Sequence, residues 1–266
     1  MGKHLNVLDF AAFKNGERKI SMVTCYDFWS AQLLDRTDVD CLLVGDSLAM
    51  VMHGHDSTVY ADVELMALHT RAVARGAPRK FIVGDMPFLS VRKGLEPAMN
   101  AVQALMQSGA SAVKIEGESG HLDIVAHIVE SGVPVMGHLG LTPQAVHGFG
   151  GHKVQARDEA AGRSLVASAR RLADAGCFAV VLECVPATVA RCVSAAIPIP
   201  TIGIGAGPHT DGQVLVLQDM LGTNPDFKPR FLRRYADGFG TIHDAVNRFH
   251  TDVQAGVFPR REESYA

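Results

Sequence analysis

Short apolar runs rich in β-branched residues recur along the whole chain, separated by amphipathic stretches. There are eight such runs, among them KISMVTCYD (residues 19–27), CLLVGDS (41–47) and KFIVGDMPF (80–88). The intervening stretches, such as EPAMNAVQALMQSG (96–109), are rich in Ala, Leu and Glu and often close with Gly, as helices do. Near-continuous apolar strands that alternate with helices are typical of a parallel sheet covered on both faces.

The number of these units narrows the fold further. Eight strand–helix units in 266 residues fit a (β/α)8 barrel, or TIM barrel, better than an open doubly wound sheet. No Pro- or Ser-rich linker and no shift in composition divides the sequence, so we expect a single α/β domain over residues 1–266. Residues 1–20 are expected to form an N-terminal capping helix at the bottom of the barrel. Residues from about 230 to 266 are expected to form a C-terminal helix and a polar tail.

The charge balance and the thiols limit the classes of partner. A net charge of −3 with scattered Lys and Arg residues gives no basic surface for nucleic acid, so we expect small-molecule substrates. No apolar run approaches the roughly 18 to 20 residues of a membrane span, and the first residues lack a signal-peptide pattern. The expected location is therefore the cytoplasm. The five cysteines have no Cys-x-x-Cys spacing and are expected to be buried, reduced thiols.

Ionisable residues end five of the eight apolar runs. Barrels of this kind carry their function at the carboxyl ends of the strands. Because side chains alternate along a strand, counting back by twos tests which residues share a face. The five residues are Asp46, Asp85, Glu116, His138 and Glu183. The count places Leu42 and Val44 below Asp46, Phe81 and Val83 below Asp85, Met136 below His138, and Ala179 and Val181 below Glu183.

The same count places Lys114 below Glu116, where a buried ammonium needs carboxylate neighbours. Three carboxylates in one mouth repel each other unless a cation compensates them. Mg²⁺ prefers oxygen ligands, so Asp46, Asp85 and Glu116 are the candidate ligands. Zinc is disfavoured because His138 is the only histidine at the site and no thiol has ligand spacing. The alternative, separate solvated charges without a shared role, is weaker for five strand ends than for one.

Other motifs have a structural interpretation beside a functional one. His138 either hydrogen-bonds a substrate or a metal-bound water, or is a satisfied strand-end histidine. GIGAG (203–207) departs from the dinucleotide fingerprint, and close backbone packing or passage of a ligand explains its glycines better. The Gly-rich segment 141–159 is either a lid or ligand-contacting loop, or a plain surface loop. His53 and His55 follow a strand end and are expected in a solvated loop.

Several ordered segments carry a family resemblance. They are MVTCYDFWSA, LLVGDSLAMVMHGHDST, VGDMPF, GASAVKIEG, GVPVMGHLGLTPQ, GGHKVQ, VLECVP and PTIGIGAGPHTDGQVLVLQDMLG. On these the sequence closely resembles the ketopantoate hydroxymethyltransferase (3-methyl-2-oxobutanoate hydroxymethyltransferase) family along nearly the whole chain. The departures are small: Cys25 and Cys41 in early strands, and a tail that reads FPRREESYA.

The resemblance implies a Mg²⁺-dependent barrel of the phosphoenolpyruvate/pyruvate type. Such an enzyme moves a hydroxymethyl group from 5,10-methylenetetrahydrofolate onto 3-methyl-2-oxobutanoate (α-ketoisovalerate), giving 2-dehydropantoate (ketopantoate) in pantothenate and coenzyme A synthesis. It also implies homo-oligomers, often decamers. With a folate as co-substrate, the ligand passing GIGAG would be the folate, and the 141–159 segment, if it is not a plain surface loop, would be a lid or pterin-contacting loop. The implied metal ligands are Asp46, Asp85 and Glu116. The implied keto-acid contacts are Asp46, Ser47, Asp85 and Lys114, with Glu183 as the proton acceptor.

The chemistry of the residues agrees with that implication. An α-keto acid can chelate the ion through a carboxylate oxygen and the keto oxygen, which stabilises the enolate left when the C3 proton goes to Glu183. Lys114 would balance negative charge, and Ser47 would hydrogen-bond the substrate carboxylate. The choice among Mg²⁺, Mn²⁺ and Co²⁺ and the number of subunits stay open.

Two rival functions are weighed against this one. A lyase or mutase of the isocitrate lyase and phosphoenolpyruvate mutase group would need a Lys-Lys-Cys-Gly-His loop, which the sequence lacks. A non-catalytic barrel that binds keto acids or acts as an assembly scaffold would have no use for an intact set of acidic residues together with Glu183.

Overall fold

A closed barrel of eight parallel strands forms the centre of the molecule. The computed structural model describes residues 5–14 and 16–265. The strands follow sequence order around the barrel, and the last pairs with the first. Each apolar run contains one strand, so the predicted barrel is confirmed. The strands are β1 (Ile20–Thr24), β2 (Cys41–Val44), β3 (Phe81–Asp85), β4 (Ala112–Glu116), β5 (Val135–Gly140), β6 (Ala179–Glu183), β7 (Thr201–Ile204) and β8 (Gly212–Leu215).

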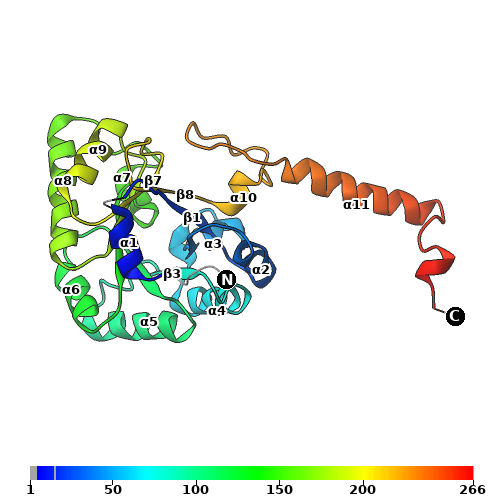
Figure 1. Cartoon of the computed structure of the whole chain (residues 1–266), viewed down its shortest axis with the longest axis horizontal. Helices are drawn as coiled ribbons and strands as arrows, with labels where there is room; N and C mark the ends of the chain where they lie inside the picture. Colours follow the sequence, from blue (N-terminus) through cyan, green and yellow to red (C-terminus); the bar gives the residue numbers. More distant parts are fainter. Residues whose placement is uncertain (1–4, 15, 266) are drawn as a thin grey trace. The chain divides into compact units, whose positions relative to one another are not determined.

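Helices cover the outside of the barrel (Figure 1). Two of the longest begin at aspartates, Asp62 and Asp158, whose side chains accept hydrogen bonds from the backbone three residues on, as N-caps do. The covering helices are α2 (Phe28–Asp35), α4 (Val63–Gly76), α5 (Leu95–Gln107), α6 (Leu122–Glu130), α8 (Glu159–Asp174) and α9 (Ala187–Ala196). Short helices lie in the loops after β2 and β5: α3 (Leu48–Val51), η1 (Thr58–Tyr60), η2 (Pro143–Ala145) and α7 (Val146–Phe149).

The connection between β7 and β8 differs from the expected strand–helix alternation. Residues 205–211 link the two parallel strands without a helix, although such crossovers usually take a dozen residues or more. Glycines make the tight path possible, because a Cβ at Gly203 would lie 2.8 Å from the Thr210 hydroxyl and one at Gly207 would lie 2.4 Å from the Ala187 Cβ. Close packing therefore accounts for these two glycines of the GIGAG motif.

The N-terminal helix closes the bottom of the barrel, as expected. Helix α1 (Val7–Lys14) inserts Phe10, which is fully buried, and its ring centroid lies 4.9 Å from that of Phe81 and 5.3 Å from that of Phe178. Residues 1–4 and 15 of the predicted segment lie outside the described residues. Phe10 joins a barrel core made of Ile20, Met22, Cys41, Leu43, Phe81, Val83, Ala112, Met136, Ala179, Val181, Ile202 and Val214.

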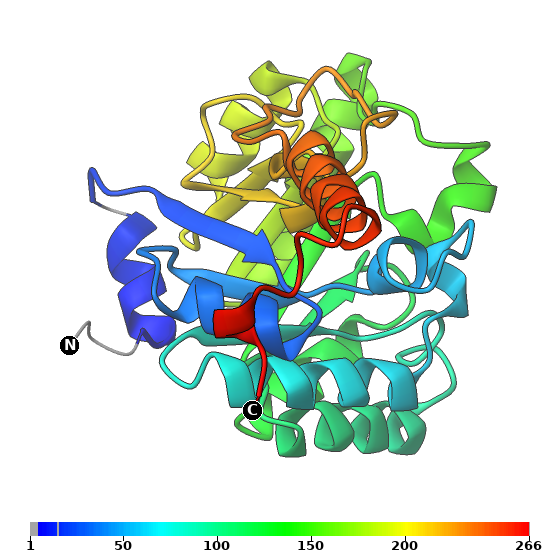
Figure 2. The same ribbon diagram turned by 90° about the vertical axis from the view of Figure 1, so that its right-hand side faces the viewer.

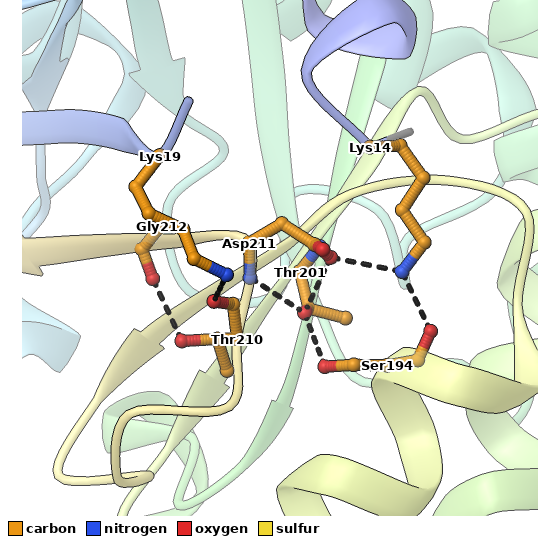
Figure 3. A network of polar contacts seen from close by, with 7 residues as sticks. All are labelled: Lys14, Lys19, Ser194, Thr201, Thr210, Asp211 and Gly212. Atoms are coloured by element: carbon orange, nitrogen blue, oxygen red, sulfur yellow. Dashed lines mark hydrogen bonds and ion pairs between the residues drawn. The ribbon is translucent and has the colours of Figure 1, made fainter. Parts of the chain in front are cut away.

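A polar network ties the same end of the barrel together where the last strands meet the first (Figure 3). Asp211, just before β8, accepts hydrogen bonds from the backbone N–H and the hydroxyl of Thr201 and forms an ion pair with Lys14 at 2.9 Å. Lys14 also donates to the Ser194 carbonyl, and Lys19 donates to the Thr210 carbonyl. The network therefore connects α1, β1, α9, β7 and β8.

The chain divides into two compact units, Met1–Leu215 and Val216–Ala266. The second contains α10 (Leu217–Met220), η3 (Arg261–Glu263) and the expected C-terminal helix, α11 (Gly238–Gln254). The single domain over residues 1–266 stays a prediction. Among the described residues, no helix is both long and apolar enough to cross a membrane. The cysteines are free thiols, as expected, although Cys184 is only half-buried and Cys192 is exposed.

Candidate active site

Asp46, the first predicted site residue, follows β2 in a turn. Counting by twos along the sequence did not predict this turn. Cys41 and Leu43, not Leu42 and Val44, point into the barrel core, so the expected alternation below Asp46 is wrong. The strand ends at Val44, and the chain then turns through Gly45. A Cβ at Gly45 would lie 2.9 Å from the Ser47 hydroxyl and 3.4 Å from Asp85 Oδ2, so glycine permits this close turn. The turn brings the Asp46 backbone N–H to Asp85 Oδ2 at 3.0 Å.

Asp85 and Lys114 lie side by side in the barrel interior, as the alternation predicts. They are register partners on β3 and β4, and Lys114 Nζ lies 2.6 Å from Asp85 Oδ1. Both are buried. Burial raises the pKa of Asp85 despite the opposing charge of Lys114. Burial alone would lower the pKa of Lys114, but Asp85, Glu116 and Asp46 raise it above its ordinary value. Lys114 is therefore a fixed cation.

His138 connects two predicted carboxylates. It is the register partner of Glu116, and its Nδ1 lies 3.4 Å from Glu116 Oε1, while its Nε2 lies 3.3 Å from Glu183 Oε2. Burial and Lys114 lower the pKa of His138, but the contacts with Glu116 and Glu183 outweigh them and raise it to about 9. At neutral pH the ring is therefore an imidazolium that orients both carboxylates. A structural role for His138 is thus evident.

Glu116 and Glu183 differ in their surroundings. Burial would raise the pKa of Glu116, but the hydrogen bond and charge of His138, together with Lys114, lower it below its ordinary value. The Glu183 side chain is 20% exposed, against 6% for Glu116. Cys184, the next residue, has a left-handed backbone (φ 48°), which is rare for a residue other than glycine and is found more often at functional sites.

Gln144 is a site residue that the strand count could not find. It lies in η2, beyond the end of β5, and its backbone N–H donates to Glu116 Oε2 at 3.0 Å. Its side-chain amide donates to Asp46 Oδ2 at 2.8 Å and to the Met86 carbonyl at 3.0 Å. The available signal was its place in the LTPQ segment after a strand end. Gln144 thus orients two of the three predicted ligands.

Tyr26, after β1, is a second site residue that the sequence did not allow us to predict. Its hydroxyl lies 2.8 Å from the hydroxyl of Ser47. Either hydroxyl can donate this hydrogen bond, and in both cases it fixes the position of the Ser47 oxygen next to Asp46. The histidines of the MHGHDS segment lie in the loop, with His53 bonded to His69 and His55 stacked on Tyr60.

The charges of the site favour a cation, but not through three preassembled ligands. Four carboxyl groups meet two cationic groups, and burial together with the charges of Asp85 and Glu116 raises the pKa of Asp46 well above its usual range. Among the described residues, no three His, Cys, Asp or Glu side chains are arranged to share one ion. Both oxygens of Glu116 already have partners, His138 and Gln144. Both oxygens of Asp85 have partners as well, Lys114 and the Asp46 backbone N–H. The pair Asp46 and Asp85 suits Mg²⁺, which is often held by one or two carboxylates with other oxygens supplied by substrate and water.

The chain is similar over nearly its whole length to a known family of enzymes. The model of the family described as ketopantoate hydroxymethyltransferase matches residues 4–261. The chain belongs to the ketopantoate hydroxymethyltransferase family. A 3-methyl-2-oxobutanoate hydroxymethyltransferase of Bdellovibrio bacteriovorus is 56% identical over 260 residues, covering 98% of this chain and 99% of its own. One from Coxiella burnetii is 55% identical over 259 residues, covering 97% of each chain. The chain is thus an enzyme, a hydroxymethyltransferase acting on small-molecule substrates.

Solved structures place the ketopantoate hydroxymethyltransferase barrel in a wider fold group. A 2,3-dimethylmalate lyase, described as a member of the phosphoenolpyruvate mutase/isocitrate lyase superfamily, superposes with a TM-score of 0.61 at 15% identity, covering 96% of each chain. Phosphonopyruvate hydrolase in complex with oxalate and Mg²⁺ superposes with a TM-score of 0.62 at 10% identity, covering 97% of this chain and 93% of the other. At these identities the likeness establishes the fold alone.

Proposed function

We propose that the enzyme transfers a hydroxymethyl group from 5,10-methylenetetrahydrofolate to 3-methyl-2-oxobutanoate, in the synthesis of pantothenate and coenzyme A. In the overall reaction the C3 hydrogen of the keto acid is replaced by the one-carbon unit, one water is consumed, and tetrahydrofolate and 2-dehydropantoate are formed. The observation that carries the proposal is the convergence of Asp46, Asp85, Lys114, Glu116, His138 and Glu183 at one end of the barrel, in a chain of this family.

The keto acid would bind above β2, β3 and β4. Lys114 supplies a permanent positive charge for an anionic substrate, because it is held protonated by its carboxylate neighbours. Ser47, fixed by Tyr26, would donate a hydrogen bond to the substrate carboxylate. Asp46 and Asp85 would place the substrate relative to these donors.

Asp46 and Asp85 would also hold the Mg²⁺ ion, with Glu116 adding negative charge beside them. Their oxygens are the ligand type that this ion prefers. Burial raises the pKa of both groups, and neighbouring carboxylates raise it further, so a cation would offset the cost of keeping them charged. Among the solved structures, phosphonopyruvate hydrolase was observed with Mg²⁺ and oxalate. When bound, the ion would polarise the keto group and ease loss of the C3 proton. Mn²⁺ or Co²⁺ would substitute for Mg²⁺ at these oxygens.

Glu183 would accept the C3 proton. It is the most exposed of the site carboxylates whose exposure is compared above, and a base must reach the substrate. The His138 ring, 3.3 Å from Glu183 Oε2, would orient the carboxylate and stabilise its charged form before the proton is taken. The position of Gly140, whose Cβ would lie 2.2 Å from the Glu183 carbonyl, fixes the backbone that carries the base.

We further propose that the enzyme is a cytoplasmic homo-oligomer, with a decamer as the expected size. Helix α11 supports the oligomer, since its apolar residues recur at helical spacing and are exposed in the single chain. These residues are Phe239, Ile242, Val246, Phe249 and Val253, exposed by 49%, 58%, 60%, 56% and 41%.

The decisive experiment follows deuterium uptake at C3 of 3-methyl-2-oxobutanoate by NMR, with Mg²⁺ and without folate. The wild-type enzyme should exchange this hydrogen, and EDTA should stop the exchange. Glu183→Gln should slow exchange by about 10²- to 10⁴-fold, the usual contribution of a general base. Glu130→Gln, at an exposed position at the end of α6, is the matched control. Exchange at the wild-type rate in Glu183→Gln would assign the proton to another base.

A further inference from the structure

Two histidines away from the carboxylate site meet at the tips of their rings. His53 lies in the loop after β2, His69 lies on α4, and their Nε2 atoms are 2.9 Å apart. The ring centroids are 5.1 Å apart, and the ring planes are nearly perpendicular, at 89°. The His53 side chain is exposed, whereas that of His69 is half-buried. Solvent therefore reaches this pair of ring nitrogens from one side.

The contact on the far side of the His69 ring decides which of its nitrogens carries the proton. Its Nδ1 is hydrogen-bonded to the backbone carbonyl of Tyr26. A carbonyl oxygen can only accept, so Nδ1 carries the proton and Nε2 of the neutral ring presents a lone pair toward His53. Metal-ligating histidines are usually held in this way, with one ring N–H on a backbone carbonyl and the other nitrogen toward the ion. His69 is thus already oriented as a ligand.

His53 can offer a second lone pair at the same point. In the hydrogen-bonded pair it donates from Nε2, because His69 Nε2 accepts. No described residue bonds to His53 Nδ1. Since this ring is exposed, water can remove the Nε2 proton and return one to Nδ1, so both Nε2 atoms face an ion without net loss of a proton. The backbone N–H of His53 donates to the Leu48 carbonyl, which fixes the start of the side chain.

The distance between the two nitrogens is close to that of a metal site. Zn²⁺ lies about 2.0–2.1 Å from histidine nitrogens, so two such ligands of a tetrahedral ion are about 3.4 Å apart. The rings would have to part by roughly half an ångström and tilt, which the exposed His53 permits. In the part of the chain that the structure describes, no third His, Cys, Asp or Glu joins the pair. Water would complete the coordination.

We propose that His53 and His69 form a second metal site, which binds a divalent transition-metal ion that prefers imidazole nitrogen, such as Zn²⁺. The carboxylate site differs in class, because its oxygens suit Mg²⁺. The inference does not rest on the proposed function.

An ion at this pair would join three segments of the chain. It would tie the loop after β2 to α4 and, through His69, to Tyr26, whose hydroxyl bonds to Ser47. Figure 2 shows the loop after β2 at the end of the barrel to which the strand arrows point, opposite α1. The ion would therefore brace the position of Ser47 from outside the carboxylate site.

Calorimetric titration of the full-length enzyme with Zn²⁺ tests the site, after EDTA treatment, dialysis and addition of excess Mg²⁺ to fill the carboxylate site. His53→Ala and His69→Ala should each weaken binding at one site by at least about 10-fold, since one of two ligands is lost. His53→Cys should keep the site, because a thiolate also binds zinc. His127→Ala, at an exposed position on α6, is the matched control. Melting temperatures confirm that each variant is folded, and the exposed His53 keeps the test valid if His69→Ala is not.

Each outcome decides the proposal. Binding that is lost in His53→Ala and His69→Ala and kept in His53→Cys and His127→Ala supports the site. Equal binding by the wild type and by His53→Ala would place the zinc elsewhere and overturn it. Loss in His53→Cys as well as in His53→Ala would show that the histidine ring shapes the loop without ligating an ion, which also overturns the proposal. No zinc binding by the wild type has the same consequence.

Discussion

The two ends of the barrel use buried polar groups in opposite ways. At the amino ends of the strands, one oxygen of Asp211 accepts hydrogen bonds from two groups of Thr201 and forms an ion pair with Lys14, which offsets its charge. At the carboxyl ends, Asp46 is buried near the charges of Asp85 and Glu116. Burial and these two charges raise its pKa. One end stabilises the fold, and the other holds charges that the fold alone does not need.

Hydrogen bonding shows the same contrast. Thr58, Ser90 and His121 lie in the loops after β2, β3 and β4. Each keeps a buried polar atom without a hydrogen-bond partner among the described residues. Such atoms cost free energy, so they are expected where a ligand, an ion or water completes the structure. The comparison teaches that stability and function are separated along the barrel axis, and substitutions can test the separation.

The largest effect is expected from Asp46→Asn at the carboxyl end. Transfer activity should fall about 1,000-fold, because a charged group that orients substrate and ion is lost. The metal-free protein should nevertheless become more stable, by about 1 kcal/mol, because a crowded buried carboxyl is removed. Steady-state rates and thermal melting in EDTA measure the two effects, with the exposed Asp38→Asn as control. A large loss of stability would contradict the contrast between the ends.

The converse result is expected from Asp211→Ala at the amino end. It should lower the free energy of unfolding by about 2–4 kcal/mol, because Lys14 and two groups of Thr201 lose their acceptor. Asp211→Asn, which keeps an acceptor but not the ion pair, should lose less. Urea unfolding measures the stability, and activity per folded molecule should stay within about twofold. A strong loss of activity in the folded fraction would mean that the two ends are coupled.

The smallest effect concerns pH and His121, which precedes α6 at the carboxyl end. Burial, with the charge of Arg92, lowers the pKa of His121 below its ordinary value of 6.5. The unfolded chain therefore binds a proton in a range where the folded chain does not. This contribution to stability is present above pH 6.5 and is lost as the pH falls below it, by at most about 1.4 kcal/mol per pH unit.

Unfolding at pH 7.5 and pH 5.5 isolates this contribution. His121→Gln should lose less stability between the two values than the wild type does, whereas His127→Gln, an exposed histidine on α6, should behave as the wild type. Equal slopes in His121→Gln and the wild type would remove His121 as the source.

Much of the architecture could be predicted from the sequence, because its rules are local. The eight apolar runs became eight strands, and the alternation placed Asp85, Lys114 and His138 inside the barrel. Alternation fails once a strand ends. Asp46 reaches the site through the turn at Gly45, and counting by twos from it therefore selected the wrong face of β2.

Other features depend on contacts between distant segments and left little trace in the sequence. Gln144 meets Asp46 across 98 residues, and a single amide in a loop has no periodic signal. The connection without a helix between β7 and β8 depends on how Gly203 and Gly207 pack against Thr210 and Ala187. The engagement of both Glu116 oxygens by His138 and Gln144, and of both Asp85 oxygens by Lys114 and the Asp46 N–H, could not be read from strand ends.

The contact between Lys14 and Asp211 also constrains how the chain comes together in time. The two residues are 197 positions apart, and β1 pairs with β8. During synthesis, the N-terminal residues therefore lack their partners until the chain has been made to about residue 215. Only then can β8 pair with β1 and close the barrel. Contacts of such long range slow folding and prolong the exposure of apolar strands. Newly made chains should accordingly depend on chaperones until the barrel is closed.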